Sequence, residues 1–214
     1  MMPETDNCTE LIQKTAFFTG HRILSAEETD LAAERVFSCI SDAYEAGYRR
    51  FYCGCALGFD TIAAFQTIRL REQHPDVRLL LAIPCATQAD LWSEKDRIVY
   101  QHILKSADEK TVLSPVYYKG AMLTRNRHMA DRSSLCICYL RHMHGGTAST
   151  VRYALLHDSI RIINLAVGTD HRPGLLRENA WNCIFISPSV SGNAGTARLH
   201  PLSARKLFMK NIQT

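Results

Sequence analysis

Short apolar runs alternate with amphipathic stretches along most of this chain, and the two patterns predict different elements. Mostly apolar runs predict strands over residues 15–19, 50–55, 77–83, 111–113, 135–140 and 161–165. Between them, apolar residues recur at helical spacing, as in the stretch from Ser25, which forms a capping box with Glu28, to Gly47. Strands that alternate with helices in this rhythm predict right-handed βαβ units and an α/β fold with a parallel sheet.

The alternating pattern ends near Ala166. We therefore expect a single domain over residues 14–166, followed by an irregular C-terminal tail over residues 167–214 that contains one plausible strand, Cys183–Ile186. The basic residues of the tail lack interleaved aromatic residues, which favours a solvated face over an arm that binds nucleic acid. The polar segment before Lys14 has no apolar core of the kind that a secretion signal needs.

Composition narrows the classes of partner. A net charge of +4 without a dense run of Lys and Arg suits an anionic small molecule and does not require nucleic acid. No apolar stretch approaches the roughly 20 residues needed to span a bilayer, so we expect a cytoplasmic protein without a membrane partner. Four of the eight cysteines lie inside apolar runs and are expected to be reduced, buried thiols: Cys53, Cys55, Cys136 and Cys138.

Glycine follows an apolar run at three places, each time in front of a segment with a helical pattern. These places are Gly20, followed by His21 and Arg22; Gly54 and Gly58, followed by Asp60; and Gly145 and Gly146, followed by Thr147. The carboxyl ends of parallel strands lie at one edge of an open sheet, where ligands bind. Glycine leaves backbone N–H groups accessible there, and the following helix N-terminus attracts an anion. The three loops therefore predict a site for a phosphate-bearing ligand.

Several of these side chains have a structural as well as a functional interpretation. Arg22 suits a bidentate contact to phosphate, but equally an exposed arginine without a ligand. Asp60 and Thr147 are each placed to cap a helix, and Asp60 alternatively binds a ribose hydroxyl or a metal, or serves as a catalytic carboxylate. Arg125 and Asn126 are candidates for an anion site, and the alternative is an amphipathic helix with a solvated basic face.

Cys136, Cys138, His142 and His144 share strand parity, which suggests a metal site on one side of an extended chain. Zinc ligands, however, usually come from turns with two to four residues between cysteines, and a Cys-x-Cys pair inside a buried strand fits this poorly. We therefore expect neither a metal site nor a bound cofactor.

Four of these features, in this order, resemble the SLOG superfamily, which joins the Smf/DprA DNA-processing proteins to the Lonely Guy cytokinin-activating proteins. The features are Phe18–Arg22, Gly58-Phe59-Asp60 with Ala63-Ala64, Arg125-Asn126-Arg127 and Gly145-Gly146-Thr147. The resemblance covers about residues 14–166 and points more narrowly to the YpsA-like branch. It implies a Rossmann-like open parallel sheet flanked by helices on both faces, and a nucleotide or nucleotide-derived ligand held by the three glycine loops. Members often form dimers, so the resemblance also implies a homodimer.

One position departs from the Lonely Guy pattern. Those phosphoribohydrolases follow their glycine pair with a Gly-Thr and then a catalytic glutamate, whereas Arg152 stands where that glutamate would fall. A cation cannot take the part of a carboxylate in N-glycosidic hydrolysis. The sequence thus favours a protein that binds a nucleotide-derived ligand, for example as a sensor. The alternatives are a hydrolase of an N-glycosidic or phosphate bond with Asp60 as its carboxylate, and DprA-like binding of single-stranded DNA, which the modest net charge disfavours.

Overall fold

The computed structural model describes residues 4–166, so the predicted tail and its strand lie outside the described part. The helices are α1 (Glu4–Gln13), α2 (Ala26–Glu45), α3 (Phe59–Gln73), α4 (Glu94–Ser106), α5 (Ala121–Ala130) and α6 (Gly145–Leu155). The strands are β1 (Thr15–Gly20), β2 (Arg50–Cys53), β3 (Arg78–Ile83), β4 (Glu109–Val112), β5 (Leu135–Tyr139) and β6 (Arg161–Asn164). The six predicted strands are thereby confirmed. None of the helices described is long and apolar enough to cross a membrane.

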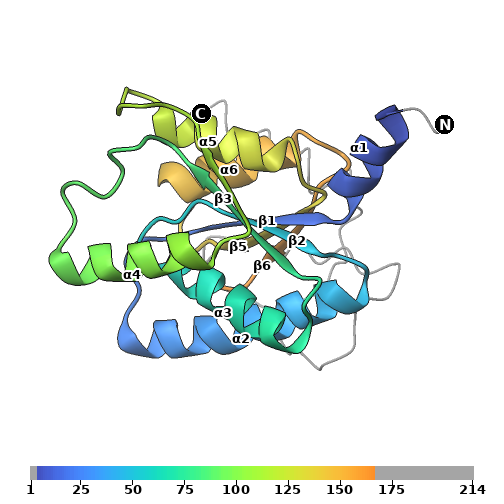
Figure 1. Cartoon of the computed structure of the whole chain (residues 1–214), viewed down its shortest axis with the longest axis horizontal. Coiled ribbons are helices and arrows are strands. Elements are labelled where there is room, and N and C mark those ends of the chain that lie inside the picture. The colour runs from blue at the N-terminus through green and yellow to red at the C-terminus, as the bar shows by residue number, and fades with distance from the viewer. Residues whose placement is uncertain (1–3, 167–214) are drawn as a thin grey trace, which may run out of the picture.

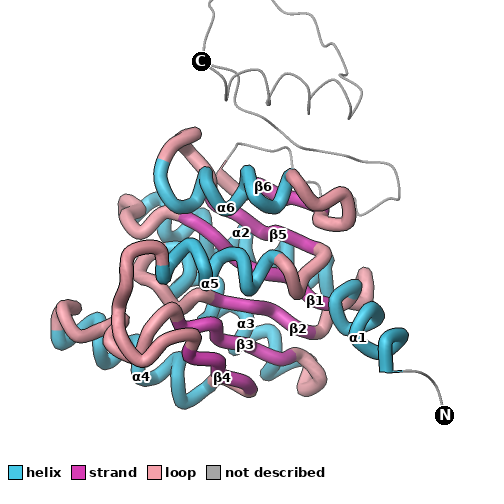
Figure 2. The backbone as a smooth tube through the Cα atoms, turned by 90° about the horizontal axis from the view of Figure 1, so that it is seen from above, coloured by secondary structure: helices cyan, strands magenta, loops and turns pink. Residues whose placement is uncertain are grey.

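The strands form one parallel sheet in the order β4-β3-β2-β1-β5-β6, which Figure 2 shows from the side of α5 and α6. From β1 the chain adds β2, β3 and β4 on one side, and then returns to place β5 and β6 on the other side of β1. Helices α2, α3 and α4 cover one face of the sheet, and α5 and α6 cover the opposite face (Figure 1). The result is the expected Rossmann-like α/β fold, with a topological switch point between β1 and β5.

Alternate side chains of the strands pack into two apolar layers. In the layer under α2, α3 and α4, the ring of Phe18 lies 6.0 Å from that of Phe51 and 6.5 Å from that of Phe59. The layer under α5 and α6 contains the fully buried Phe17 and Met129. Burying each such side chain contributes about 1.5–3 kcal/mol to stability. Because both faces are covered, the inner strands are apolar at almost every position, which explains the clarity of the sequence pattern.

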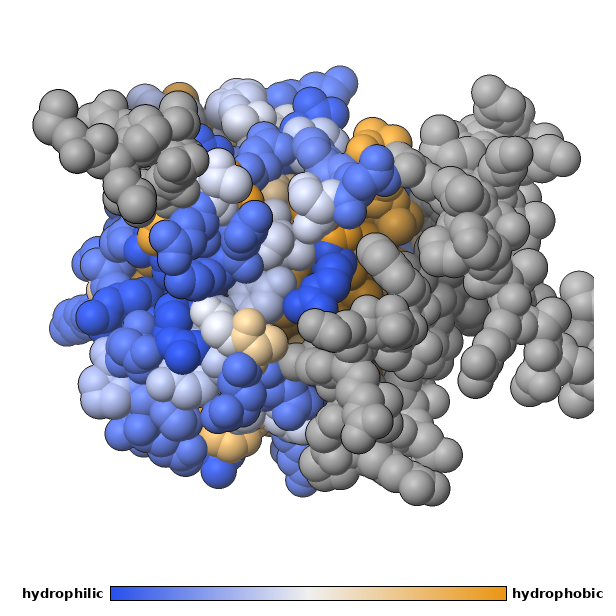
Figure 3. All heavy atoms as spheres, turned by 90° about the vertical axis from the view of Figure 1, so that its right-hand side faces the viewer, coloured by the Kyte–Doolittle hydropathy of each residue, from blue (hydrophilic) through white to orange (hydrophobic). Residues whose placement is uncertain are grey.

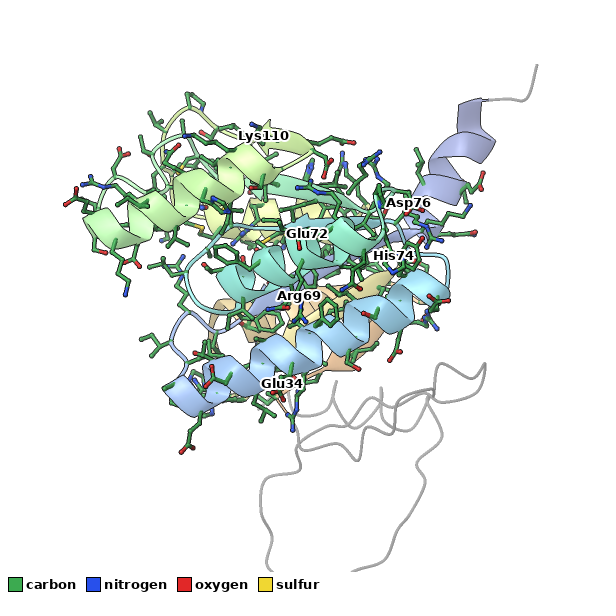
Figure 4. All side chains as sticks on the ribbon, turned by 60° about the horizontal axis from the view of Figure 1, so that its bottom comes forward. Glu34, Arg69, Glu72, His74, Asp76 and Lys110 are labelled. Carbon is green, nitrogen blue, oxygen red and sulfur yellow. The ribbon has the colours of Figure 1, made fainter. Side chains whose placement is uncertain are left out.

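A surface contact between side chains also joins α2 and α3 of the first layer. Figure 4 shows α2, α3 and α4 over this face, with Arg69 between α2 and α3. The guanidinium of Arg69 lies 4.1 Å from the centroid of the Phe37 ring, so its charge stacks on an aromatic face while the residue stays exposed to solvent.

The sequence pattern does not predict α1, because the segment before Lys14 mixes polar and charged residues without a clear apolar face. The end of α1 is attached to the sheet by two side-chain hydrogen bonds. Thr15 Oγ1 donates to the carbonyl of Leu11 (2.6 Å), and Ser134 Oγ donates to the carbonyl of Gln13 (2.9 Å). These contacts place α1 at the amino-terminal edge of the strands, on the opposite side from the predicted ligand loops (Figure 1).

Candidate functional site

The loops that follow β1 and β5 meet at the switch point. Gly20, the last residue of β1, pairs in register with Tyr139, the last residue of β5. Beyond this pair, the backbone N–H of Arg141 donates to Nε2 of His21 (2.9 Å). The guanidinium of Arg141 donates to the carboxylate of Glu28 on α2 (2.5 Å). The two loops and the first turn of α2 are thus fastened together.

Helices α2 and α4 both begin with a side-chain cap. Glu28 N–H donates to Ser25 Oγ (3.2 Å) and Ser25 N–H donates to Glu28 Oε2 (2.8 Å), which is the predicted capping box. The bond from Ser25 N–H, together with the charge of Arg141, holds the pKa of Glu28 below its ordinary value. On α4, Asp96 N–H donates to Ser93 Oγ (3.1 Å). In each of these two helices, one of the free N–H groups of the first turn therefore already has a hydrogen-bond acceptor within the protein.

Helix α6 begins without such a cap. Its N-cap residue His144 makes no side-chain hydrogen bond to the helix, and its first turn has no acidic residue. Gly145 (φ +83°) and Gly146 are exposed, and a Cβ on either would meet nothing within 4 Å. Thr147 is the third residue of α6 and buried, so the prediction that it caps the helix is wrong; the helix begins two residues earlier. The first N–H groups of α6 are left to solvent or to a ligand.

The glycines of the other two loops lie against other parts of the chain. A Cβ on Gly20 would lie 2.4 Å from Cβ of Phe59, and one on Gly58 (φ +79°) would lie 2.3 Å from the carbonyl oxygen of Arg22. A Cβ on Gly54 would lie 1.1 Å from a guanidinium nitrogen of Arg125. Internal packing accounts for these three glycines, and their contact with a ligand stays a prediction.

Arg125 of α5 reaches past the end of the sheet to Asp60 of α3. Both side chains are 6% exposed, and Arg125 Nη1 lies 3.4 Å from Asp60 Oδ2, which also accepts from Ala56 N–H (3.3 Å). Burial raises the pKa of Asp60, against the opposing charges of Arg125 and Arg22. Within the described structure, Nε of Arg125 is buried without a hydrogen-bond partner. Asp60 follows the N-cap Gly58 by two residues, so it ties its loop to α5 and does not cap α3. Its catalytic role stays a prediction.

Asn126 connects α5 to the glycine pair. Its Nδ2 donates to Thr150 Oγ1 (2.5 Å), and Thr150 Oγ1 donates to the carbonyl of Gly146 (2.9 Å). Arg125 and Asn126 are both buried, whereas Arg127 is exposed. The alternative of a solvated basic face is therefore wrong for the first two residues and holds for Arg127.

Three histidines of the switch-point loops, His21, His142 and His144, lie next to one another and are called the histidine row below. The ring centroids of His21 and His142 are 5.6 Å apart, and those of His142 and His144 are 5.5 Å apart. His142 and His144 are exposed and His21 is half-buried. Burial, followed by the charges of Arg141 and the other two histidines, lowers the pKa of His21, and the carboxylate of Glu28 opposes this.

The histidine row does not form a metal site with the cysteines of β5. Cys136 and Cys138 are fully buried in the layer under α5 and α6, away from the exposed histidines. Across residues 9–166, whose side chains the structure describes, no three His, Cys, Asp or Glu residues gather in a way that could hold a metal ion. Cys53 and Cys55 are also free and buried, so the prediction of buried thiols in the apolar runs is confirmed.

Arg152, which stands where the Lonely Guy proteins carry their glutamate, has a structural contact. Its guanidinium donates to the carbonyl of Met143, in the loop before α6. This bond positions the loop that carries His142 and His144.

A surface depression is also present along α4. It is lined by Glu94, Arg97, Ile98, Gln101, His102 and Lys105. All six belong to α4 and none to the switch-point loops, so the depression is a feature of one exposed helix and is separate from the candidate site.

Three residues of the site are missed by reasoning from the sequence. Arg141 directly follows the buried run of β5, and that position at the carboxyl end of a strand is a signal that could identify it. Glu28 is predicted only as part of the capping box. Nothing in the sequence marks Thr150 as the partner of Asn126, because their contact depends on how α5 packs against α6.

Comparison with known proteins relates the chain to one family. The model of the YspA SLOG family (YpsA) matches residues 26–158. The uncharacterized SPbeta prophage-derived protein YoqJ of Bacillus subtilis (strain 168) is 26% identical over 117 residues, which are 49% of this chain and 68% of YoqJ. The UPF0398 protein BH1768 of Halalkalibacterium halodurans is 30% identical over 91 residues, which are 42% of this chain and 48% of that protein.

Two solved structures are similar to the chain, and the first of them shares its fold. DNA processing protein A (DprA) from Streptococcus pneumoniae superposes with a TM-score of 0.51 and 18% identity, over 71% of this chain and 50% of DprA. DprA from Helicobacter pylori, known for a single-stranded DNA binding mode, gives a TM-score of 0.48 and 19% identity, over 70% of this chain and 64% of that one. The chain thus spans about half the length of BH1768 and of the pneumococcal DprA.

Proposed function

The chain belongs to the YspA SLOG family, and from this premise we propose that it binds a nucleotide or nucleotide-derived ligand at the switch point between β1 and β5. An anionic group of the ligand, such as a phosphate, accepts hydrogen bonds from the first N–H groups of α6. The resemblance implies this class of ligand, and the site described above supplies the groups that would hold it.

The uncapped N-terminus of α6 carries the proposal. A helix end with free N–H groups and its dipole pointing outward attracts anions. Serine side chains cap α2 and α4, whereas α3, α5 and α6 have no side-chain cap. Of these three helices, α6 is the one that begins after β5 at the switch point, with open space beside Gly145 and Gly146. Asn126, through Thr150, holds the carbonyl of Gly146 and so fixes the orientation of this turn.

Arg22 supplies a second cationic group. Its side chain is exposed just after β1, and no hydrogen bond or ion pair of its guanidinium is found among the described side chains, residues 9–166. A guanidinium in this state is available for a bidentate contact with phosphate. Gly20 and Gly58 contribute indirectly. Because they have no side chain, Phe59 packs closely against Gly20, and the backbone of Arg22 packs closely against Gly58.

Two observations favour binding without turnover. Arg152 contacts the Met143 carbonyl at the position where a glutamate would be required, and Asp60 is buried against Arg125 and Ala56 N–H. A buried carboxylate with these partners suits the organisation of a loop better than attack on an exposed ligand.

The proposal is tested by thermal shift and titration calorimetry with a panel of nucleotides, dinucleotides and ADP-ribose. A ligand at about 100 times its dissociation constant stabilises the native state by about 2.7 kcal/mol, which raises the melting temperature visibly. A single-stranded oligonucleotide is included because the fold is shared with DprA. If only the oligonucleotide binds, with an affinity that falls steeply with salt, the chain is a DNA-binding protein and the proposal fails.

Gly146→Ala makes the test specific for α6. The new Cβ meets no atom of the protein but points toward the helix N-terminus, where the anion would lie. Alanine in a helix is favoured over glycine by roughly 0.5–1 kcal/mol, so we expect unchanged or higher stability and at least about tenfold weaker binding, which corresponds to 1.4 kcal/mol.

Gly47→Ala is the matched control. Gly47 has φ +95° and no atoms beside it, and it follows the end of α2 at the amino-terminal edge. Alanine there is strained by its backbone conformation, so this variant should lose stability and keep its affinity. Equal affinity of the wild type and Gly146→Ala for the same ligand would refute binding at α6.

A further inference from the structure

Among the described residues, the histidine row brings three imidazoles together at the switch point, and imidazole is the side chain best suited to exchange a proton with a ligand near neutral pH. It consists of residues from both loops of the proposed site: His21 after β1, and His142 and His144 after β5. His144 is also the N-cap residue of α6, so the row ends at the glycine pair where the anion is proposed to bind.

Hydrogen bonding makes one histidine of the row different from the other two. Nε2 of His21 accepts from the backbone N–H of Arg141 (2.9 Å). A nitrogen that accepts carries no proton, so a proton on this atom would break the bond that fastens the two loops. His142 and His144 are exposed, stacked with an interplanar angle of 14°, and can take up a proton without that loss.

Several fixed charges face the row. Arg141 lies beside His21 on the β5 side, Arg22 follows His21 in the chain, and Glu28 of α2 is the acidic group that acts on His21. The positive N-terminal end of α6 also faces the row. Arg152 of α6 donates a hydrogen bond to the carbonyl of Met143, which stands between His142 and His144 in the chain. Cationic groups thus outnumber the single carboxylate, and they oppose protonation of the row until an anion is present.

We propose that the histidine row couples ligand binding to proton uptake, so that the site binds its anionic ligand more tightly at acidic than at neutral pH. The inference rests on the proposed function. When the anion binds at α6, its charge offsets the surrounding cations, and imidazolium forms on His142 or His144. The protonated ring then adds a charge-assisted hydrogen bond donor to the anion.

The experiment measures ADP-ribose binding by calorimetry at about pH 6 and about pH 8, on either side of the histidine range, in buffers of different ionisation enthalpy. The bridging diphosphate of ADP-ribose keeps a constant charge over this range, so its own titration does not contribute. We expect binding at the lower pH to be about tenfold tighter, and a net uptake of protons on binding.

Two variants identify which histidines take up the protons on binding. The double variant His142→Gln/His144→Gln should bind with an affinity that no longer rises at low pH and should take up no protons. His102→Gln is the matched control, because His102 is exposed on α4, stacked on Phe65 at 5.7 Å and outside the switch-point loops. This variant should keep the full pH dependence.

The outcomes separate this inference from the proposed function. Binding that is independent of pH, or a pH dependence that persists in the double variant, overturns the proton coupling and leaves the ligand site intact. Failure of ADP-ribose and of every panel nucleotide to bind at either pH overturns both.

Discussion

At the scale of one residue, the guanidinium of Arg125 contributes both to the packing of the fold and to the arrangement of the candidate site. It fills the space above Gly54 and is the cationic partner of Asp60. Breaking a buried ion pair by removing one member leaves an uncompensated charge and typically costs 3–5 kcal/mol. Arg125→Met keeps much of the volume but not the charge, and we expect it to lower the free energy of unfolding by about 3 kcal/mol at neutral pH.

The pH dependence of that loss identifies its cause. Burial already raises the pKa of Asp60 in the folded protein, and removal of Arg125 raises it further. A carboxyl group whose folded pKa lies above its unfolded value weakens the fold as the pH rises through that interval, and has no such effect below it. The deficit of Arg125→Met, measured by urea unfolding, should therefore shrink as the pH falls toward about 4. Asp60→Asn in the Arg125→Met background should recover most of it at neutral pH. A deficit that is the same at every pH would point to lost packing.

The glycines show what a sequence can and cannot reveal about single residues. Gly20, Gly54 and Gly145 all occur in the same pattern of an apolar run, a glycine and a helix. The sequence therefore predicts the same role for all three, namely contact with a phosphate-bearing ligand. In the structure the space beside Gly20 and Gly54 is taken by Phe59 and Arg125, whereas that beside Gly145 is open. The difference is made by side chains distant in sequence, and no local pattern carries that information.

At the scale of elements, α6 lacks the side-chain cap that α2 and α4 have, as do α3 and α5. His144 has extended backbone angles (φ −128°, ψ 165°), which are those of an ordinary N-cap residue. His144→Asp would supply the missing side-chain acceptor together with a negative charge at the positive end of the helix. We expect an increase in stability of about 1 kcal/mol and a loss of affinity for the anionic ligand, because the new carboxylate occupies the same N–H groups.

Ser93→Ala is the opposite change on a helix outside the site. It removes the Oγ acceptor of α4 and should cost about 1 kcal/mol without altering the affinity for the ligand. Thermal unfolding and titration of both variants give the comparison. A His144→Asp variant that binds the ligand as tightly as the wild type would contradict the competition at α6.

The strands and most helices follow from the sequence because parallel strands covered on both faces are almost continuously apolar. The boundaries of α3 and α6 do not. Asp60 and Thr147 are good N-cap residues by type, yet α3 starts at Phe59 and α6 at Gly145. In both cases the helix begins near a glycine, earlier than the position of the cap-forming residue indicates. Residue propensities alone do not show whether the glycine or the cap-forming residue marks the start of the helix.

On the scale of the whole molecule, the two edges of the sheet differ in how their charges are balanced. Figure 3 shows the amino-terminal edge, where hydrophilic residues predominate over much of the surface. Arginines there are paired with acids: Arg49 with Asp76 (2.7 Å), Arg50 with Glu109 (3.0 Å) and Arg71 with Asp108 (2.6 Å). At the carboxyl edge, Arg141 is paired with Glu28 (2.5 Å) and Arg125 with Asp60 (3.4 Å). Arg22 and the uncapped α6 have no such partner among the described residues. The first edge contributes to stability, and the second is available to an anion.

This division predicts that stability and binding can be changed separately. The Asp108 carboxylate, 20% exposed, accepts from Leu79 N–H (2.8 Å) and from Arg71, and thereby joins β3, α3 and the start of β4. Asp108→Ala removes charge-assisted bonds worth about 1.5–3 kcal/mol each in favourable cases, so the free energy of unfolding should fall by about 2 kcal/mol. Asp76→Ala, at a pair whose acid is 55% exposed, should lower the free energy of unfolding much less, because solvent screens an exposed ion pair. Both variants should bind the ligand as the wild type does, because the lost contacts lie at the far ends of the strands. A parallel loss of affinity in Asp108→Ala would mean that the sheet transmits strain from one edge to the other, and that the two edges are not independent.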